Sequence, residues 1–214
     1  MQYTLAYINE AIACLAVPDR YTRAMLFCRA QEFYESPCRK FKGKAFSIWD
    51  YFSWYAKASP KKCFSYPSDY VGFNVPVAIL AECYSLCKAE TPYDDVMKNL
   101  AFKLLLANPK SYLIGAPSLS DSTFKHELAH AFYHTNTDYK SEVDKLTAKI
   151  PAEGLKQFKS NLKDLGYCSA VMKDEIQAYL ATGLTFSVSR DVSGTGKLQA
   201  KYKAVFEMYR REFT

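Results

Sequence analysis

Apolar residues recur at intervals of three and four along most of the chain, which is the spacing of one face of an α-helix. The ends of one predicted helix are well defined, because Thr91-Pro92 favours a helix start and Asn108-Pro109 favours a helix end. Residues 24–34 suit a helix or a buried strand equally well, since short apolar runs do not separate the two. The pattern predicts helices over residues 48–57, 76–88, 91–107, 122–134, 138–150, 152–165, 172–181 and 197–213.

Two of these helices carry more specific expectations. In residues 48–57, the spacing predicts that Trp49, Phe52 and Tyr55 face the core. The helix over residues 76–88 is expected to open at Asn74, with its proline in the first turn.

The best strand candidate is residues 111–115, directly before the helix at 122–134. Gly166 is expected to end the helix before it, and residues 191–196 to form a loop. No repeat, low-complexity stretch or linker divides the chain. We therefore expect one domain over residues 1–214, of the α+β class and predominantly helical, with a small sheet.

The composition is that of a folded protein, since 49% of the residues are hydrophobic and 15% are aromatic. No stretch approaches the roughly 18 apolar residues of a membrane span. The N-terminus meets Glu10 before a signal-like apolar core forms, so neither a membrane association nor a secretory signal is expected. We interpret the 7 cysteines, an odd number, as core thiols of a protein in a reducing compartment, either the cytoplasm or one reached without a classical signal peptide.

The net charge is +6, from 28 Lys and Arg against 22 Asp and Glu. The basic residues are spread over the chain in small clusters, and no nucleic-acid recognition motif accompanies them. We expect no nucleic-acid partner. The oligomeric state is left open by the sequence.

The strongest chemical signal is the pair His126 and His130, with Glu127 directly after the first histidine. On a helix, residues four apart lie on one face about 6 Å from each other, so two imidazole nitrogens can bind one Zn²⁺. Glu127 lies about 100° around the helix, where its carboxylate can take a proton from a metal-bound water. The chain has only 3 histidines, so this spacing has a low chance of arising by accident.

This His-Glu-Leu-Ala-His segment resembles the His-Glu-x-x-His signature of the zincin metallopeptidases. A catalytic site of that kind needs a third protein ligand. His134 lies about 12 Å along the helix axis from His126, too far to bind the same ion from a straight helix. The third ligand should therefore come from a second helix.

Glu175 with Ala178 three residues later resembles the pattern of the Glu-liganded zincins, called gluzincins. The resemblance implies that Glu175 binds the metal and that the small Ala178 allows the two helices to approach closely. Asp174 is an alternative, either as the ligand or as the partner of a ligand imidazole through its far N–H. Glu142 and Asp138 are further alternatives.

The resemblance also implies a zincin-like fold, divided around the metal between a His helix and a Glu helix. In that fold, the strand before the His helix is expected to lie at the sheet edge and to pair with an extended substrate. A donor must steady the oxyanion of the reaction. Tyr179 and His134 are the leading candidates, and Tyr133, Tyr139 and Tyr167 are others.

The expected function is hydrolysis of a peptide bond by a zinc-dependent peptidase, with a narrow protein or peptide substrate and Glu127 as the base. Two alternatives remain open at this stage. The first is a zincin-like protein that binds metal or a partner without catalysis. The second is a metal-free helical interaction module in which the motif is accidental.

Overall fold

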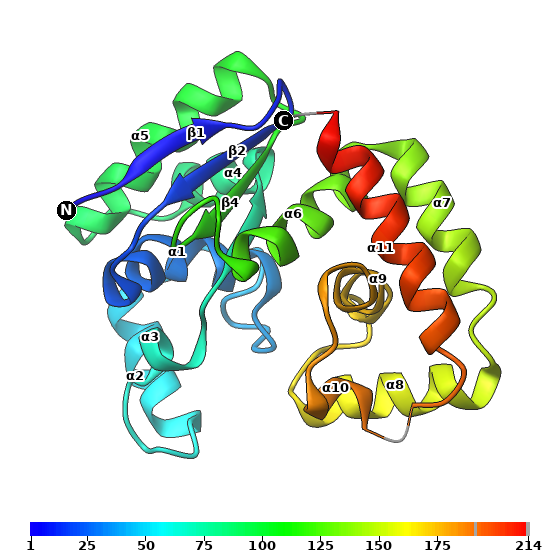
Figure 1. Cartoon of the computed structure of the whole chain (residues 1–214). Helices are drawn as coiled ribbons and strands as arrows, with labels where there is room; N and C mark the ends of the chain where they lie inside the picture. The colour runs from blue at the N-terminus through cyan, green and yellow to red at the C-terminus, as the bar shows by residue number, and fades with distance from the viewer. Residues whose placement is uncertain (191, 213–214) are drawn as a thin grey trace. The chain divides into compact units, whose positions relative to one another are not determined.

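The computed structural model describes residues 1–190 and 192–212 (Figure 1). Within it the chain forms two compact units, Met1–Phe124 and Lys125–Thr214. The boundary falls inside helix α6, Ser122–Thr135, which explains why the sequence offers no linker at this point. Each unit has buried hydrophobic residues of its own. The expectation of a single domain stays a prediction.

The first unit contains a four-stranded sheet in the order β1-β2-β4-β3. β2 pairs with β4 in parallel, whereas β1 and β3 lie antiparallel at the two edges. The strands are β1 Thr4–Tyr7, β2 Ile12–Ala16, β3 Phe73–Pro76 and β4 Tyr112–Ala116.

The predicted strand at residues 111–115 is present as β4, but its expected place at the sheet edge is wrong. β4 lies between β2 and β3 and is buried along its whole length. A strand that is bonded on both sides has no free backbone groups for a substrate. The edge strands are β1 and β3. The sequence pattern predicted neither of them, and it did not predict β2.

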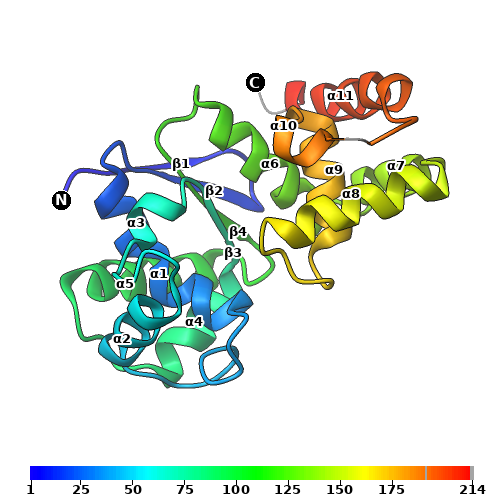
Figure 2. The same cartoon turned by 90° about the horizontal axis from the view of Figure 1, so that it is seen from below.

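Three helices of the first unit pack together on one side of the sheet: α1 Arg20–Glu35, α4 Val77–Leu86 and α5 Pro92–Ala107 (Figure 2). Residues 24–34 are thus helical. The aromatic ring of Phe27 on α1 lies so close to Gly115 that a Cβ there would come within 2.4 Å of it, so only glycine fits this strand position. As predicted, α5 begins at Thr91-Pro92, and the side chain of Thr91 is part of a capping box.

Two local predictions in this unit are wrong. Trp49 is 57% exposed on α2, Ile48–Ala58, whereas Phe52 and Tyr55 are half-buried against the core as predicted. The fully buried residues of this helix are Ile48 and Tyr51. Asn74 belongs to β3, and α4 begins only after Pro76. The proline ends the strand at a position where its missing N–H does not disturb the helix that follows. The short helix α3, Tyr66–Asp69, completes the unit.

The second unit is entirely helical in its described part. α11, Gly196–Arg211, packs against α7, Thr137–Thr147, and against α9, Met172–Thr182. α8, Ala152–Asp164, contacts α9 and the short α10, Phe186–Ser189. All the helices predicted here are present with slightly different ends, and α10 was not predicted; Asp191 and Phe213 lie outside the described residues.

The structure confirms the coarse fold class, α+β and predominantly helical with a small sheet. None of the helices in residues 1–190 and 192–212 is both long and apolar enough to cross a membrane. The prediction of core thiols holds only for some cysteines. Cys14, Cys28, Cys83 and Cys87 are buried, Cys38 is half-buried, and Cys63 and Cys168 are exposed.

Candidate metal centre

Helix α6 holds the two histidines of the motif on one face. Its start is fixed by Asp121, whose carboxylate accepts a hydrogen bond from the backbone N–H of Thr123 at 2.7 Å. An apolar stripe on the same helix is buried: Phe124, Leu128, Ala131 and Phe132. The side chain of His130 is only 4% exposed, and that of His126 is 21% exposed.

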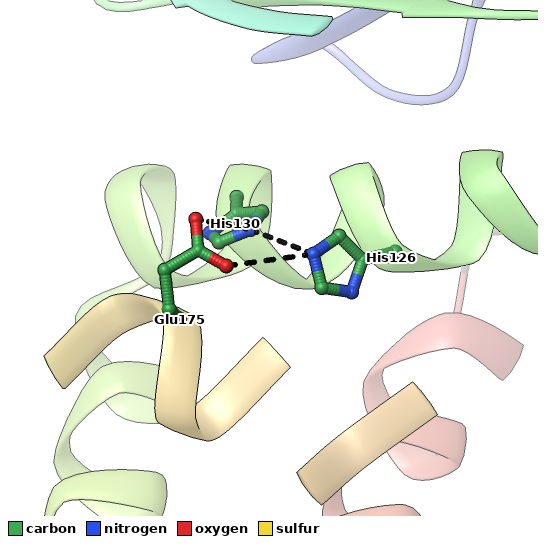
Figure 3. A group of neighbouring side chains, drawn as sticks. All are labelled: His126, His130 and Glu175. Atoms are coloured by element: carbon green, nitrogen blue, oxygen red, sulfur yellow. Dashed lines mark hydrogen bonds and ion pairs between the residues drawn. The ribbon is translucent and has the colours of Figure 1, made fainter. Parts of the chain in front are cut away.

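Helix α9 brings Glu175 to these histidines (Figure 3). The Nε2 atoms of His126 and His130 lie 3.2 Å apart. The two carboxylate oxygens of Glu175 lie 3.7 Å from Nε2 of His126 and 3.6 Å from Nε2 of His130. The structure therefore brings together the three residues that the motif and the resemblance selected, and Ala178, one turn along α9, is fully buried.

Hydrogen bonds fix the proton positions on both imidazoles. Nδ1 of His130 lies 2.9 Å from Oδ1 of Asp174, and a carboxylate can only accept, so the proton is on Nδ1. Nδ1 of His126 lies 3.3 Å from the hydroxyl oxygen of Thr182, which already donates its own proton to the carbonyl of Ala178 at 2.7 Å. Nδ1 of His126 must therefore be the donor as well. When both rings are neutral, this leaves a lone pair on each Nε2, and the two Nε2 atoms face each other at 3.2 Å.

This arrangement fits a metal ion. Two ligands at 2.0–2.1 Å from one tetrahedral zinc lie about 3.3 Å from each other, close to the measured separation of the two nitrogens. Oε2 of Glu175 is buried and has no hydrogen-bond partner in the described residues. Buried acceptors without a donor are costly, and a cation between them removes the cost. The His126, His130 and Glu175 group could hold a metal ion.

The electrostatics of the centre favour a positive charge. Burial alone would lower the pKa of His130, but the carboxylates of Asp174, Glu175 and Glu127 outweigh it and raise this pKa well above its ordinary value. The same negative groups that attract a proton to these rings attract a divalent cation. Asp174 thus lies where the second of its two expected roles would place it, with its carboxylate against Nδ1 of His130.

Glu127 lies beside this group and is 7% exposed. Its negative charge contributes to the raised pKa values of His130, Tyr167 and Tyr179. The ring of Tyr179 lies 4.8 Å from that of His126, and its hydroxyl lies 3.1 Å from the hydroxyl of Tyr167. Burial, above all, raises the pKa of both phenols, so each hydroxyl keeps its proton and can donate it.

The other candidates lie elsewhere. His134 is exposed and is not part of the His126, His130 and Glu175 group. The carboxylate of Glu142 accepts a hydrogen bond from Tyr209, and Asp138 is exposed in the first turn of α7. Two tyrosines proposed as oxyanion donors use their hydroxyls on other partners: Tyr133 donates to Asp144 and Tyr139 donates to Gln177.

Two residues of the centre were missed in the sequence, Thr182 and Gln177. Thr182 holds the imidazole of His126, and Gln177 contacts Asp174. Both lie on the buried side of α9, seven residues after Glu175 and three after Asp174. Polar side chains at helical spacing on an otherwise apolar face were the signal that could have found them.

Comparisons with protein-family models, curated proteins and solved structures gave no match for this chain. The resemblance to the zincins therefore depends on the motif and on the geometry of the site.

Proposed function

We propose that the protein is a zinc-dependent peptidase of the zincin type, with His126, His130 and Glu175 as the metal ligands. The observation that carries this proposal is the convergence of three possible ligand groups from two helices on one point. Three protein ligands leave one coordination position open, as in catalytic rather than structural zinc sites. A bound zinc would acidify water and polarise the scissile carbonyl.

Glu127 is the general base in this proposal. It follows His126 directly on α6, so the helix places its carboxylate beside the metal ligands and not among them. From there it takes a proton from the attacking water and later passes it to the leaving amine.

Tyr179 is the preferred oxyanion donor, because its ring lies against His126 and its phenol stays protonated. Tyr167 supports it through the contact between the two hydroxyls. His134 is a weaker candidate for this role, because it is exposed near the far end of α6. We propose a protein or peptide as the substrate and, given the buried thiols, a reducing compartment as its location.

One observation favours an alternative, a zincin-like protein that binds metal without catalysis. Glu127 is 7% exposed and His130 is 3% exposed, and closed sites are typical of structural metals. The two functions differ in what Glu127 does. In the alternative, no peptide is cleaved and the Glu127 carboxylate is dispensable.

The decisive experiment is to profile cleavage sites in a complex mixture of proteins with the wild type and with Glu127→Gln, each loaded with one equivalent of Zn²⁺. We expect Glu127→Gln to fold and keep its zinc, while cleavage falls by roughly two to four orders of magnitude. The matched control is Glu142→Gln, whose carboxylate lies on α7 with Tyr209 and which should cleave normally. A zinc-loaded wild type that cleaves no better than Glu127→Gln would favour the non-catalytic alternative.

A further inference from the structure

A buried chain of polar side chains runs from α7 through α9 to the metal-facing His130. The hydroxyl of Tyr139 donates to Oε1 of Gln177 at 2.8 Å. Nε2 of Gln177 donates to Oδ1 of Asp174 at 2.9 Å and lies 3.2 Å from the carbonyl oxygen of Ala129 on α6. Asp174 in turn accepts from Nδ1 of His130. Tyr139 and Gln177 are both 0% exposed, so neither can exchange these partners for water.

The direction of every hydrogen bond in this chain is determined. The carboxylate of Asp174 and the carbonyl of Ala129 can only accept, so the NH₂ end of the Gln177 amide must face them. The carbonyl end then faces Tyr139, whose hydroxyl must be the donor. A rotated amide would set its oxygen against these two acceptors, so they fix its orientation, and the hydroxyl of Tyr139 satisfies the amide oxygen.

Asp174 needs such a support. Its side chain is 31% exposed in the first turn of α9, where the carboxylate could otherwise turn toward solvent. Gln177, three residues later on the same helix, is within reach of it. Its N–H binds the same oxygen that accepts from His130, which keeps this oxygen in place.

We propose that Gln177, whose amide oxygen is held by Tyr139, is a positioning residue for the metal centre. It holds Asp174 against Nδ1 of His130, so that the ring keeps its proton there and presents Nε2 to the ion. This inference rests on the metal centre of the proposed function, but it does not depend on peptidase activity. A residue that only filled space between helices would affect the stability of the fold and leave the metal affinity unchanged.

The test is the Zn²⁺ dissociation constant of the full chain, measured by competition with a chromophoric chelator, for Gln177→Leu, Tyr139→Phe and the double variant. Residues that support metal ligands typically contribute 10- to 100-fold in affinity, so we expect a loss of roughly tenfold or more for Gln177→Leu. Tyr139→Phe should lose less. The double variant should match Gln177→Leu, because Tyr139 acts only through the amide.

The matched control is Tyr202→Phe, which removes another fully buried tyrosine hydroxyl of the same unit, one bonded to Thr147 at 2.6 Å. It should keep the wild-type affinity. The proposal is overturned if folded Gln177→Leu binds Zn²⁺ within about twofold of the wild type, or if Tyr202→Phe loses as much affinity as Tyr139→Phe. Where Gln177→Leu does not fold, the comparison of Tyr139→Phe with Tyr202→Phe decides alone. A wild type that binds no zinc refutes the metal centre itself, whereas a wild type with one zinc and insensitive variants refutes only the role of Gln177.

Discussion

Two buried polar clusters, one in each compact unit, differ in how donors and acceptors are matched. In the first unit, the guanidinium of Arg29 is 0% exposed and donates to both carboxylate oxygens of Asp94, at 2.8 and 3.0 Å. It also donates to Glu90 at 2.9 Å and to the carbonyl of Phe46 at 2.7 Å. In the second unit, the two Nε2 atoms and the Glu175 carboxylate face one another. Oε2 of Glu175 has no hydrogen-bond donor among the described residues.

This contrast separates a structural cluster from a binding site. Burial would raise the pKa of Asp94, but the hydrogen bonds and charge of Arg29 hold it below its ordinary value. Both carboxylates of that cluster accept hydrogen bonds from Arg29. At His130 the carboxylates of Asp174, Glu175 and Glu127 outweigh burial and raise the pKa, so this cluster attracts a positive charge, whether a proton or a cation. The group of His126, His130 and Glu175, with a buried acceptor that lacks a donor, is therefore the better candidate for a ligand-binding site.

The largest effect on metal binding is expected from substitutions in the group of His126, His130 and Glu175. His126→Ala or His130→Ala should abolish binding of one equivalent of Zn²⁺, because two remaining protein ligands leave too weak a site. Zinc content can be measured on protein purified without a histidine tag. His134→Ala, which changes an exposed histidine on the same helix, is the control and should keep its zinc. A full equivalent retained in either ligand variant would place the metal elsewhere.

A substitution in the cluster of Arg29, Glu90 and Asp94 should change the stability of the protein and leave its metal binding unchanged. Arg29→Met should lower the free energy of unfolding by about 3–5 kcal/mol, because it leaves the carboxylates of Asp94 and Glu90 without their buried partner. Both tryptophans of the chain, Trp49 and Trp54, lie in this unit, so urea unfolding followed by their fluorescence reports on it.

Two results would define this prediction further. Adding Asp94→Asn and Glu90→Gln to Arg29→Met should recover part of the loss, since the orphaned charges are then removed. The zinc content of Arg29→Met should equal that of the wild type. A loss of stability below about 1 kcal/mol would mean that the buried ion pair contributes little beyond its own desolvation cost.

The sequence predicts the metal centre better than it predicts the sheet, and the reason is physical. Helical spacing alone places His126 and His130 on one face, so the central pair needs no knowledge of the fold. Most helices were predicted for the same reason. Strands such as β2 Ile12–Ala16 are buried on both faces and show no alternation, so their short apolar runs resemble helix segments.

What the sequence could not give was the set of long-range partners. The roles of Asp174 and Thr182 depend on how α9 lies against α6, and no local pattern encodes that approach. Glu175 was selected through the resemblance and not through spacing. Arg29 and Asp94 are 65 positions apart, and only the packing of α1 against α5 identifies them as a pair.

Glu32 in the first unit is a third buried group, intermediate between the Arg29 cluster and the metal centre. It is 4% exposed, and its Oε2 has no hydrogen-bond partner among the described residues. Burial raises the pKa of this carboxyl, and the nearby hydroxyls of Ser36, Tyr51 and Tyr66 oppose the rise only in part. Like the metal centre it has an unmatched acceptor, but no second ligand accompanies it.

The smallest expected effect is therefore a gain of stability in Glu32→Gln. A raised pKa in the folded state means that the wild type loses stability as the pH rises above the carboxyl's ordinary value near 4.5, because the folded protein must then give up a proton that it holds tightly. Glutamine cannot ionise, so at pH 7 the variant should be more stable by about 1 kcal/mol, with a melting temperature roughly 2–4 °C higher. The difference should vanish below about pH 4, where the carboxyl is protonated in both states. Melting curves of Glu32→Gln at pH 4 and pH 7, beside the exposed Glu82→Gln as a control, measure this directly. A variant that is less stable than the wild type at pH 7 would mean that the Glu32 carboxylate has a positive partner, and would move it into the class of the Arg29 cluster.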